Sequence, residues 1–210
     1  MKLKTVFAAG AAIASLCATA AVHAAPTLAF TPNQLQGPAD YQPNIPVNLA
    51  MVFTANSNTN ATALGFYDLA DATGSEDVGL YDSTGNLLSS VSVAASAGNV
   101  ISGYHFANIA PVALTAGDTY AVVAQVFNNP WQYGTINSSP SVTFNFDAYD
   151  YVGALHDWTN TNGSGPAYFG PNLLVASVPE PATWAMMLIG ASLIGAGLRI
   201  GRGQAAPARA

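Results

Sequence analysis

The chain has 210 residues and carries eleven Asp or Glu against five Lys or Arg. All five basic residues lie near the two ends, so residues 25–178 contain ten carboxylates and no Lys or Arg. Because proteins bind nucleic acid chiefly by neutralising phosphates with basic side chains, this composition excludes a nucleic-acid partner for that segment. The only cysteine, Cys17, lies near the amino end, so the segment also lacks the thiol needed for disulfides, thiolate metal sites or cysteine nucleophiles.

The first 24 residues have the pattern of a secretory signal peptide. Lys2 and Lys4 precede an apolar stretch from Val6 to Val22, and small residues ending at Ala24 form a cleavage site before Ala25. Cleavage there removes Cys17 and exports the remainder of the chain. We therefore expect a signal peptide at 1–24, a mature domain at 25–177 and a C-terminal segment at 178–210.

Residues 25–177 are predicted to form a single all-β domain. Short stretches of β-branched and aromatic residues alternate with turn signals, and no stretch shows a helical period. Asp82–Asn86 and Leu114–Tyr120 are predicted to be tight turns. The expected fold is an antiparallel β-sandwich, with a jelly roll as the favoured variant. The predicted strands are Val47–Phe53, Ala63–Tyr67, Val78–Tyr81, Leu87–Val93, Val100–Phe106, Thr119–Phe127, Val142–Phe146 and Tyr168–Val175.

An acidic loop joins two of the predicted strands. Asp68, Asp71, Glu76 and Asp77 lie within ten residues that also include Gly74. Oxygen ligands on a flexible loop are what calcium prefers, although this spacing differs from that of an EF-hand. Two interpretations follow: the four carboxylates form a calcium site, or the loop is a solvated connector between strands.

The mature segment offers little for catalysis. Its two histidines, His105 and His156, lack metal-ligand spacing, and no serine lies in a Gly-x-Ser-x-Gly elbow. His105 is expected on an apolar strand as a core or edge residue. His156 precedes Asp157 in a loop, where the neighbouring carboxylate would face the wrong way to orient a base. We predict no catalytic residues, no enzymatic activity and no cofactor other than the calcium considered above.

Aromatic residues gather in or near the loops of the second half, among several asparagines. They are Trp131, Tyr133, Tyr149, Tyr151, Trp158 and Tyr168. Sugar rings stack on aromatic faces while amides bond sugar hydroxyls, so Trp131, Tyr133 and Trp158 are the candidate carbohydrate-binding residues. The alternative is that these large rings cap the end of the hydrophobic core.

The C-terminal segment combines a recognition sequence, a short apolar helix and a basic stop. Its uncharged stretch at 182–198 would form roughly 26 Å of helix, which is the lower limit for crossing a bilayer. The arginines that follow would stay on the cytoplasmic side. Two prolines keep the glutamate between them on an extended, exposed segment. The recognition sequence is Val178, Pro179, Glu180 and Pro181, and the basic stop is Arg199 and Arg202.

This arrangement, over Val178–Arg202, resembles the PEP-CTERM sorting signal of Gram-negative bacteria. The resemblance implies recognition by an exosortase, transient anchoring in the inner membrane and removal of the helix. It also implies delivery to the cell envelope, cell surface or extracellular matrix. The alternative is a plain C-terminal membrane anchor.

A second resemblance covers residues 28–175. Ala63–Asp68, Val78–Leu88 and Pro111–Tyr120 are similar to a β-sandwich domain of unknown function that recurs in PEP-CTERM and other bacterial surface proteins. The resemblance implies the fold and says little about activity, because the repeated residues have structural explanations. We therefore expect an exported, exosortase-processed protein with a structural or adhesive role in biofilm or exopolysaccharide. The alternative function is a lectin-like, carbohydrate-binding module, either dependent on calcium or independent of it.

Overall fold

The structure, a computed structural model, describes residues 25–67, 69, 73–95, 100–151, 153–158, 167–178, 187–188 and 190–192. In these residues strands predominate and every strand pairing is antiparallel. The strands are β1 (Thr27–Leu28), β2 (Phe30–Leu35), β3 (Val47–Ala55), β4 (Thr59–Tyr67), β5 (Ser75–Asp82), β6 (Leu87–Ala94), β7 (Val100–Ile101), β8 (Tyr104–Leu114), β9 (Thr119–Val126), β10 (Tyr133–Ser138), β11 (Val142–Asp150), β12 (Ala167–Tyr168) and β13 (Pro171–Ser177).

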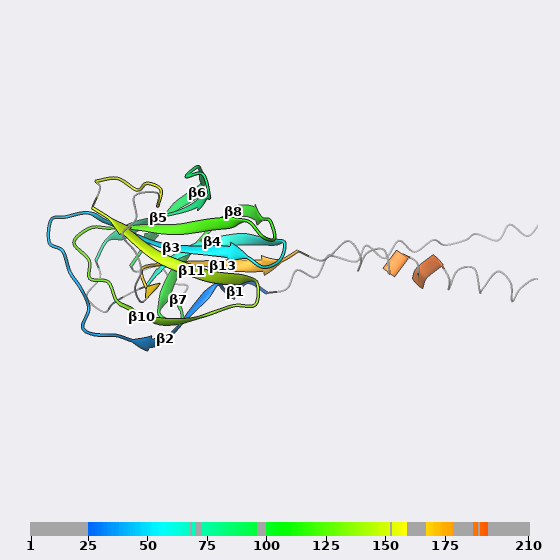
Figure 1. Cartoon of the computed structure of the whole chain (residues 1–210), viewed down its shortest axis with the longest axis horizontal. Helices are drawn as coiled ribbons and strands as arrows, with labels where there is room; N and C mark the ends of the chain where they lie inside the picture. Colours follow the sequence, from blue (N-terminus) through cyan, green and yellow to red (C-terminus); the bar gives the residue numbers. More distant parts are fainter. Residues whose placement is uncertain are drawn as a thin grey trace, which may run out of the picture.

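Two five-stranded sheets form the body of the domain, and a three-stranded sheet lies beside them (Figure 1). The first sheet has the order β1-β13-β4-β8-β7, and the second has the order β11-β3-β9-β5-β6. The small sheet has the order β12-β10-β2. The two large sheets enclose a common hydrophobic core, as aligned sheets do in a sandwich. The predicted antiparallel β-sandwich is confirmed.

Successive strands cross repeatedly between the two large sheets. The chain passes from β3 in the second sheet to β4 in the first, back to β5, and later from β8 in the first sheet to β9 in the second. As a result β1-β13-β4-β8 faces β3-β9-β5-β6, and β11 adds a further strand outside β3. This strand order supports the jelly-roll variant that the sequence predicts.

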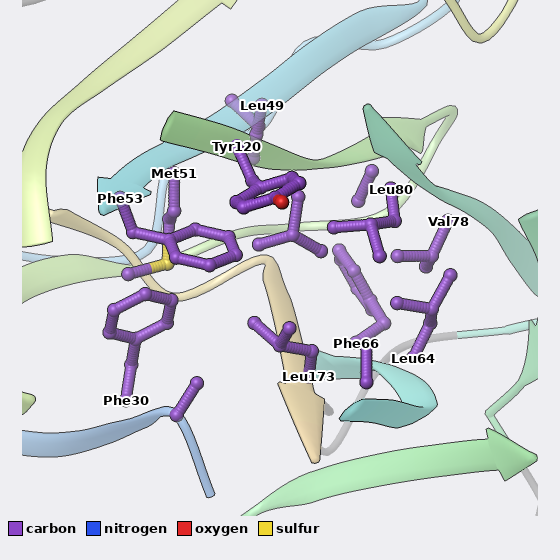
Figure 2. Close-up of a cluster of buried hydrophobic side chains, with 14 of the residues drawn as sticks. Phe30, Leu49, Met51, Phe53, Leu64, Phe66, Val78, Leu80, Tyr120 and Leu173 are labelled. Carbon is purple, nitrogen blue, oxygen red and sulfur yellow. The ribbon is translucent and has the colours of Figure 1, made fainter. Parts of the chain in front are cut away.

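The core follows the alternation that the sequence predicts. Val78 and Leu80 on β5 are fully buried and face the interior, where Leu64 and Phe66 of β4 approach them from the other sheet (Figure 2). Further along the core, the Phe30 ring packs edge-on against another phenylalanine of β3, with ring centroids 5.7 Å apart. Full burial of each large apolar side chain contributes about 1.5–3 kcal/mol to folding, so this shared interior is what holds the two sheets together.

The hairpin between β5 and β6 forms where the sequence predicts a turn. Asp82 caps it: Oδ1 accepts hydrogen bonds from the backbone amides of Thr84 and Asn86 at 2.8 and 3.0 Å. Gly85 adopts a φ of 84°, which side chains disfavour and glycine permits. The Thr84 hydroxyl and the Asn86 side-chain amide also donate to this carboxylate, and these two bonds, followed by those from the backbone, lower the pKa of Asp82 to about 2.

Several strand boundaries differ from those predicted. The predicted strand Val100–Phe106 is divided into β7 and β8, because Ser102 and Gly103 both take positive φ angles and form a turn. The predicted strand Tyr168–Val175 is likewise divided into β12 and β13. The strands β2 and β10 were not predicted, since β2 contains a proline and its side chains are mostly exposed. Apolar alternation is weak in such strands, and pairing decides their conformation.

Both ends of the domain leave the sandwich on the same side. Thr27 of β1 pairs with Val175 of β13, and Ser177 at the end of β13 pairs with Thr59 at the start of β4. We call this side the exit end. The strand β3 runs toward it and begins at Val47 on the opposite side, which we call the pocket end (Figure 1). Nine residues at about 3.3 Å each separate the two ends by roughly 30 Å.

Few of the residues that follow the sandwich are described. Residues 187, 188 and 190–192 are helical, and the Ser192 hydroxyl donates a 2.7 Å hydrogen bond to the Leu188 carbonyl one turn earlier. Within the described part of the chain, no helix has the length and hydropathy needed to cross a membrane. The predicted signal peptide and most of the predicted span at 182–198 lie outside the described residues.

Candidate functional site

The pocket end carries a hollow of about 180 Å³, which we call the distal pocket. Four aromatic residues and one carboxylate form its walls, and two apolar residues of β3 belong to its lining. The lining residues are Asp40, Val47, Leu49, Trp131, Tyr149, Tyr151 and Tyr168. Asp40 is exposed and Tyr151 keeps 54% of its surface accessible, so the hollow opens to solvent. Its size suits one small molecule or a single unit of a polymer.

Segments far apart in sequence build this pocket. Asp40 and Trp131 are joined by an isolated antiparallel bridge, with backbone N–H···O distances of 2.8 and 3.0 Å. Tyr149 near the end of β11 pairs with Leu49 of β3, and Tyr168 belongs to the short strand β12. Backbone pairing therefore fixes the pocket walls, which makes the hollow a property of the fold rather than of one loop.

The tyrosine rings of the pocket support one another. The Tyr149 ring packs edge-on against Tyr151, with centroids 5.6 Å apart at 77°, and against Tyr168, with centroids 6.1 Å apart at 87°. Such edge-to-face pairs are favourable by about 0.5–1.5 kcal/mol beyond their burial. Tyr149 is the central ring of the three, so the pocket is largely formed in the absence of a ligand.

The pocket has a negative electrostatic character. Burial raises the pKa of Tyr168, and Asp147, the neighbouring tyrosines and Asp40 raise it further. The pKa of Tyr151 is also raised, first by burial and then by Tyr149 and Asp40. Nearby groups contribute to both shifts, because they disfavour the ionised, negatively charged form of each tyrosine. An anion would meet the same resistance in this pocket.

The structure separates the three predicted carbohydrate-binding residues. Trp131 lies in the distal pocket and is 5% exposed. Tyr133 begins β10 and its hydroxyl packs against Gly37. Trp158 lies on the outer face of the second sheet, edge-on to Phe146 with centroids 5.8 Å apart. The sequence identified a group of aromatic residues but could not show which of them line the same pocket. No local signal in the sequence indicated that Asp40 belongs to it.

Two residues of the predicted calcium site are described, and the fold directs them apart. Glu76 and Asp77 are consecutive on β5, so their side chains point to opposite faces of the sheet. Glu76 faces the interior and is 4% exposed, whereas Asp77 is exposed. Asp68 and Asp71 lie outside the described residues, and among those described no group of three or more His, Cys, Asp or Glu is placed to hold a metal ion. Calcium binding by these four residues stays a prediction.

Glu76 is instead held by an amide. The Asn129 side chain donates from Nδ2 to the Glu76 carboxylate and to the Thr73 carbonyl, and its Oδ1 accepts from the Thr73 amide at 2.9 Å. Burial raises the pKa of Glu76 from 4.5 to about 7, although its hydrogen bonds with Asn129 and the Phe127 backbone oppose that shift. Near neutral pH this side chain is therefore a mixture of its acid and its carboxylate.

The two histidines of residues 25–178 lie apart. His105 is buried on β8 opposite Phe66 of β4, as expected of a core histidine. His156 lies in a loop between two carboxylates, with Nε2 3.4 Å from Asp150 Oδ2 and Nδ1 3.4 Å from Asp157 Oδ1. The contact between His156 and Asp150 connects the loop at 153–158 to the end of β11. The absence of catalytic residues stays a prediction.

The fold and the pocket together define a β-sandwich domain with a small polar and aromatic site at one end. Residues 32–144 match a family described as a domain of unknown function (DUF4082), and the chain belongs to this family. Residues 177–202 match the PEP-CTERM protein-sorting motif. No curated protein and no solved structure matches the chain.

The sorting motif indicates the localisation of the protein. It identifies an exported, envelope-associated protein that is processed by an exosortase. The sequence resemblances to a PEP-CTERM signal and to a surface β-sandwich of unknown function are both confirmed. Val178 is described and partly exposed directly after β13, whereas Pro179, Glu180, Pro181, Arg199 and Arg202 lie outside the described residues.

Proposed function

We propose that this protein has a structural or adhesive role in the biofilm matrix of a Gram-negative bacterium, in contact with exopolysaccharide. A precursor anchored in the inner membrane would be cut by exosortase, and the β-sandwich would then act in the envelope, at the cell surface or in the matrix. The proposed role is non-enzymatic and requires no cofactor.

The observation that carries this proposal is the opposite placement of the exit end and the distal pocket. Because β1 pairs with β13, the chain enters and leaves the sandwich on one side. The pocket lies on the other side, at the start of β3 and the end of β11. A domain attached through residues beyond 178 would thus present its pocket outward, as an adhesive module requires.

The test is the partition of the full chain in an exosortase-positive host that forms a matrix. Wild-type protein should sediment with the extracellular matrix, and Tyr151→Ala should reduce that fraction because Tyr151 is an exposed pocket wall. Leu87→Ala is the matched control, since Leu87 is similarly exposed at 51% but lies at the start of β6, near the exit end. Equal retention of all three proteins would refute an adhesive role for the pocket.

A second candidate function is a carbohydrate-binding module. Trp131 and the three pocket tyrosines support it, because amphipathic rings and hydroxyls are typical of sugar sites. Binding of neutral glycans by the purified full chain, with and without chelator, separates this function from a purely structural one and tests its calcium dependence.

A further inference from the structure

The distal pocket combines features that select for charge. Its walls come from five separate segments, and the Asp40–Trp131 bridge and the packing of Tyr149 against two other tyrosines hold it open to solvent. The aromatic residues that line this preformed hollow carry hydroxyl or indole groups. A ligand therefore enters without first ordering the site, which favours even a small ligand.

The charge around the pocket is one-sided. Asp40 forms part of the wall, and Asp147 lies two residues before Tyr149 on β11 and interacts with the Tyr168 hydroxyl. Residues 25–178 contain no Lys or Arg, so no Lys or Arg of this segment neutralises Asp40. Aromatic rings add to the effect, because their faces attract cations. A cationic ligand can supply a positive charge beside Asp40.

We infer that the distal pocket binds a compact organic cation, an ammonium group borne on a small molecule or on an amino sugar. Asp40 provides the counter-ion, the tyrosine hydroxyls accept hydrogen bonds from a primary ammonium, and the rings contact its alkyl carbons. The volume of about 180 Å³ admits one such unit. Anions and neutral sugars lack the charge that this site attracts.

The inference concerns the ligand of the pocket and is independent of sorting and matrix retention. It also differs from the neutral carbohydrate alternative. Glucosamine and N-acetylglucosamine differ in the presence of the charged amino group, so this pair separates recognition of charge from recognition of a sugar ring. Choline carries the charge without a sugar and distinguishes the two sources of ammonium.

The experiment is calorimetric titration of the purified full chain at pH 6 and physiological salt, where amines are charged and diffuse attraction is screened. Glucosamine, choline or both should bind at one site, about tenfold or more tightly than glucose and N-acetylglucosamine. Asp40→Asn keeps the oxygen that accepts from the Tyr41 amide but loses the charge, and it should weaken ammonium binding about tenfold.

The control is Asp118→Asn, which removes an exposed carboxylate from the turn between β8 and β9 at the exit end. This variant should bind ammonium ligands as wild type does. Equal loss in both variants would mean diffuse attraction to an acidic surface and would overturn the inference. It would also be overturned if neither cation bound, or if N-acetylglucosamine bound as tightly as glucosamine, the latter favouring the neutral carbohydrate function.

Discussion

Replacing Glu76 by Gln should stabilise the folded chain above pH 7 and flatten its stability profile between pH 4.5 and pH 7. Burial raises the pKa of Glu76 from 4.5 to about 7, so the folded state binds the proton more tightly than the unfolded state does. The resulting stability is fully present below pH 4.5 and is lost as the pH rises through about 7. Each unit of pKa difference corresponds to about 1.4 kcal/mol, so the loss is about 3 kcal/mol.

Glutamine keeps an oxygen that accepts from Asn129 and carries no charge at any pH. In thermal unfolding of the full chain, the wild type should melt on the order of 10 °C lower at pH 8 than at pH 4.5 as a result of this group. In the Glu76→Gln variant, the melting temperature should not show the part of this decrease that comes from Glu76. Comparing the two proteins isolates the contribution of Glu76, because every other titratable group is present in both.

Asp77→Asn is the matched control, because it removes the adjacent carboxylate on the opposite, exposed face of β5. It should leave most of the pH dependence in place, because the charge of Asp77 is the smallest of the contributions to the pKa of Glu76. The reasoning would be refuted if Glu76→Gln had the same pH dependence as wild type, or if it were less stable than wild type at pH 8.

Three further predictions follow from the packing, the sorting motif and the acidic loop. Gly65→Ala should destabilise the sandwich by about 1–3 kcal/mol in denaturant titrations, because the new methyl would lie 2.7 Å from the His105 carbonyl oxygen and still closer to the Phe106 ring. Glu180→Ala should leave the C-terminal tail uncut in an exosortase-positive host, as intact mass would show; equal trimming of both proteins would contradict it. If calcium binds the acidic loop, a concentration of a hundred times Kd should stabilise the fold by about 2.7 kcal/mol, and Asp71→Asn with Asp77→Asn should abolish the increase in melting temperature. An equal increase with magnesium would indicate screening of an acidic surface.

The sequence predicts best those elements whose signal is local. The turn at Asp82–Asn86 was predictable because an aspartate, a threonine and a glycine within five residues satisfy the turn by themselves. Buried positions such as Leu64 and Leu80 followed from alternation along a strand. By contrast, the polar strand β2 is extended because β10 pairs with it, and the residues of β2 alone do not predict that pairing.

The candidate site was harder to predict because tertiary pairing assembles it. Trp131 and Asp40 lie far apart in sequence and meet through two backbone hydrogen bonds that do not depend on their side chains. Glu76 was read as part of an acidic loop, but strand alternation places it inside the sandwich, where Asn129 binds it. The pKa values of the carboxylates likewise depend on tertiary placement: burial is the main cause of the raised pKa of Glu76, whereas hydrogen bonds lower the pKa of Asp82.

The pairing of β13 with β4 also determines how the domain would bear a mechanical load. A molecule held through residues beyond 178 and pulled at the distal pocket carries the force along β13, whose pairing with β4 runs from Pro171 to Ser177. The hydrogen bonds between antiparallel strands are perpendicular to the strand axis. A force along β13 therefore loads all of its hydrogen bonds with β4 at the same time, in shear, and does not break them one after another. Adhesion at the pocket and attachment at the exit end would therefore load the sandwich in its mechanically resistant direction.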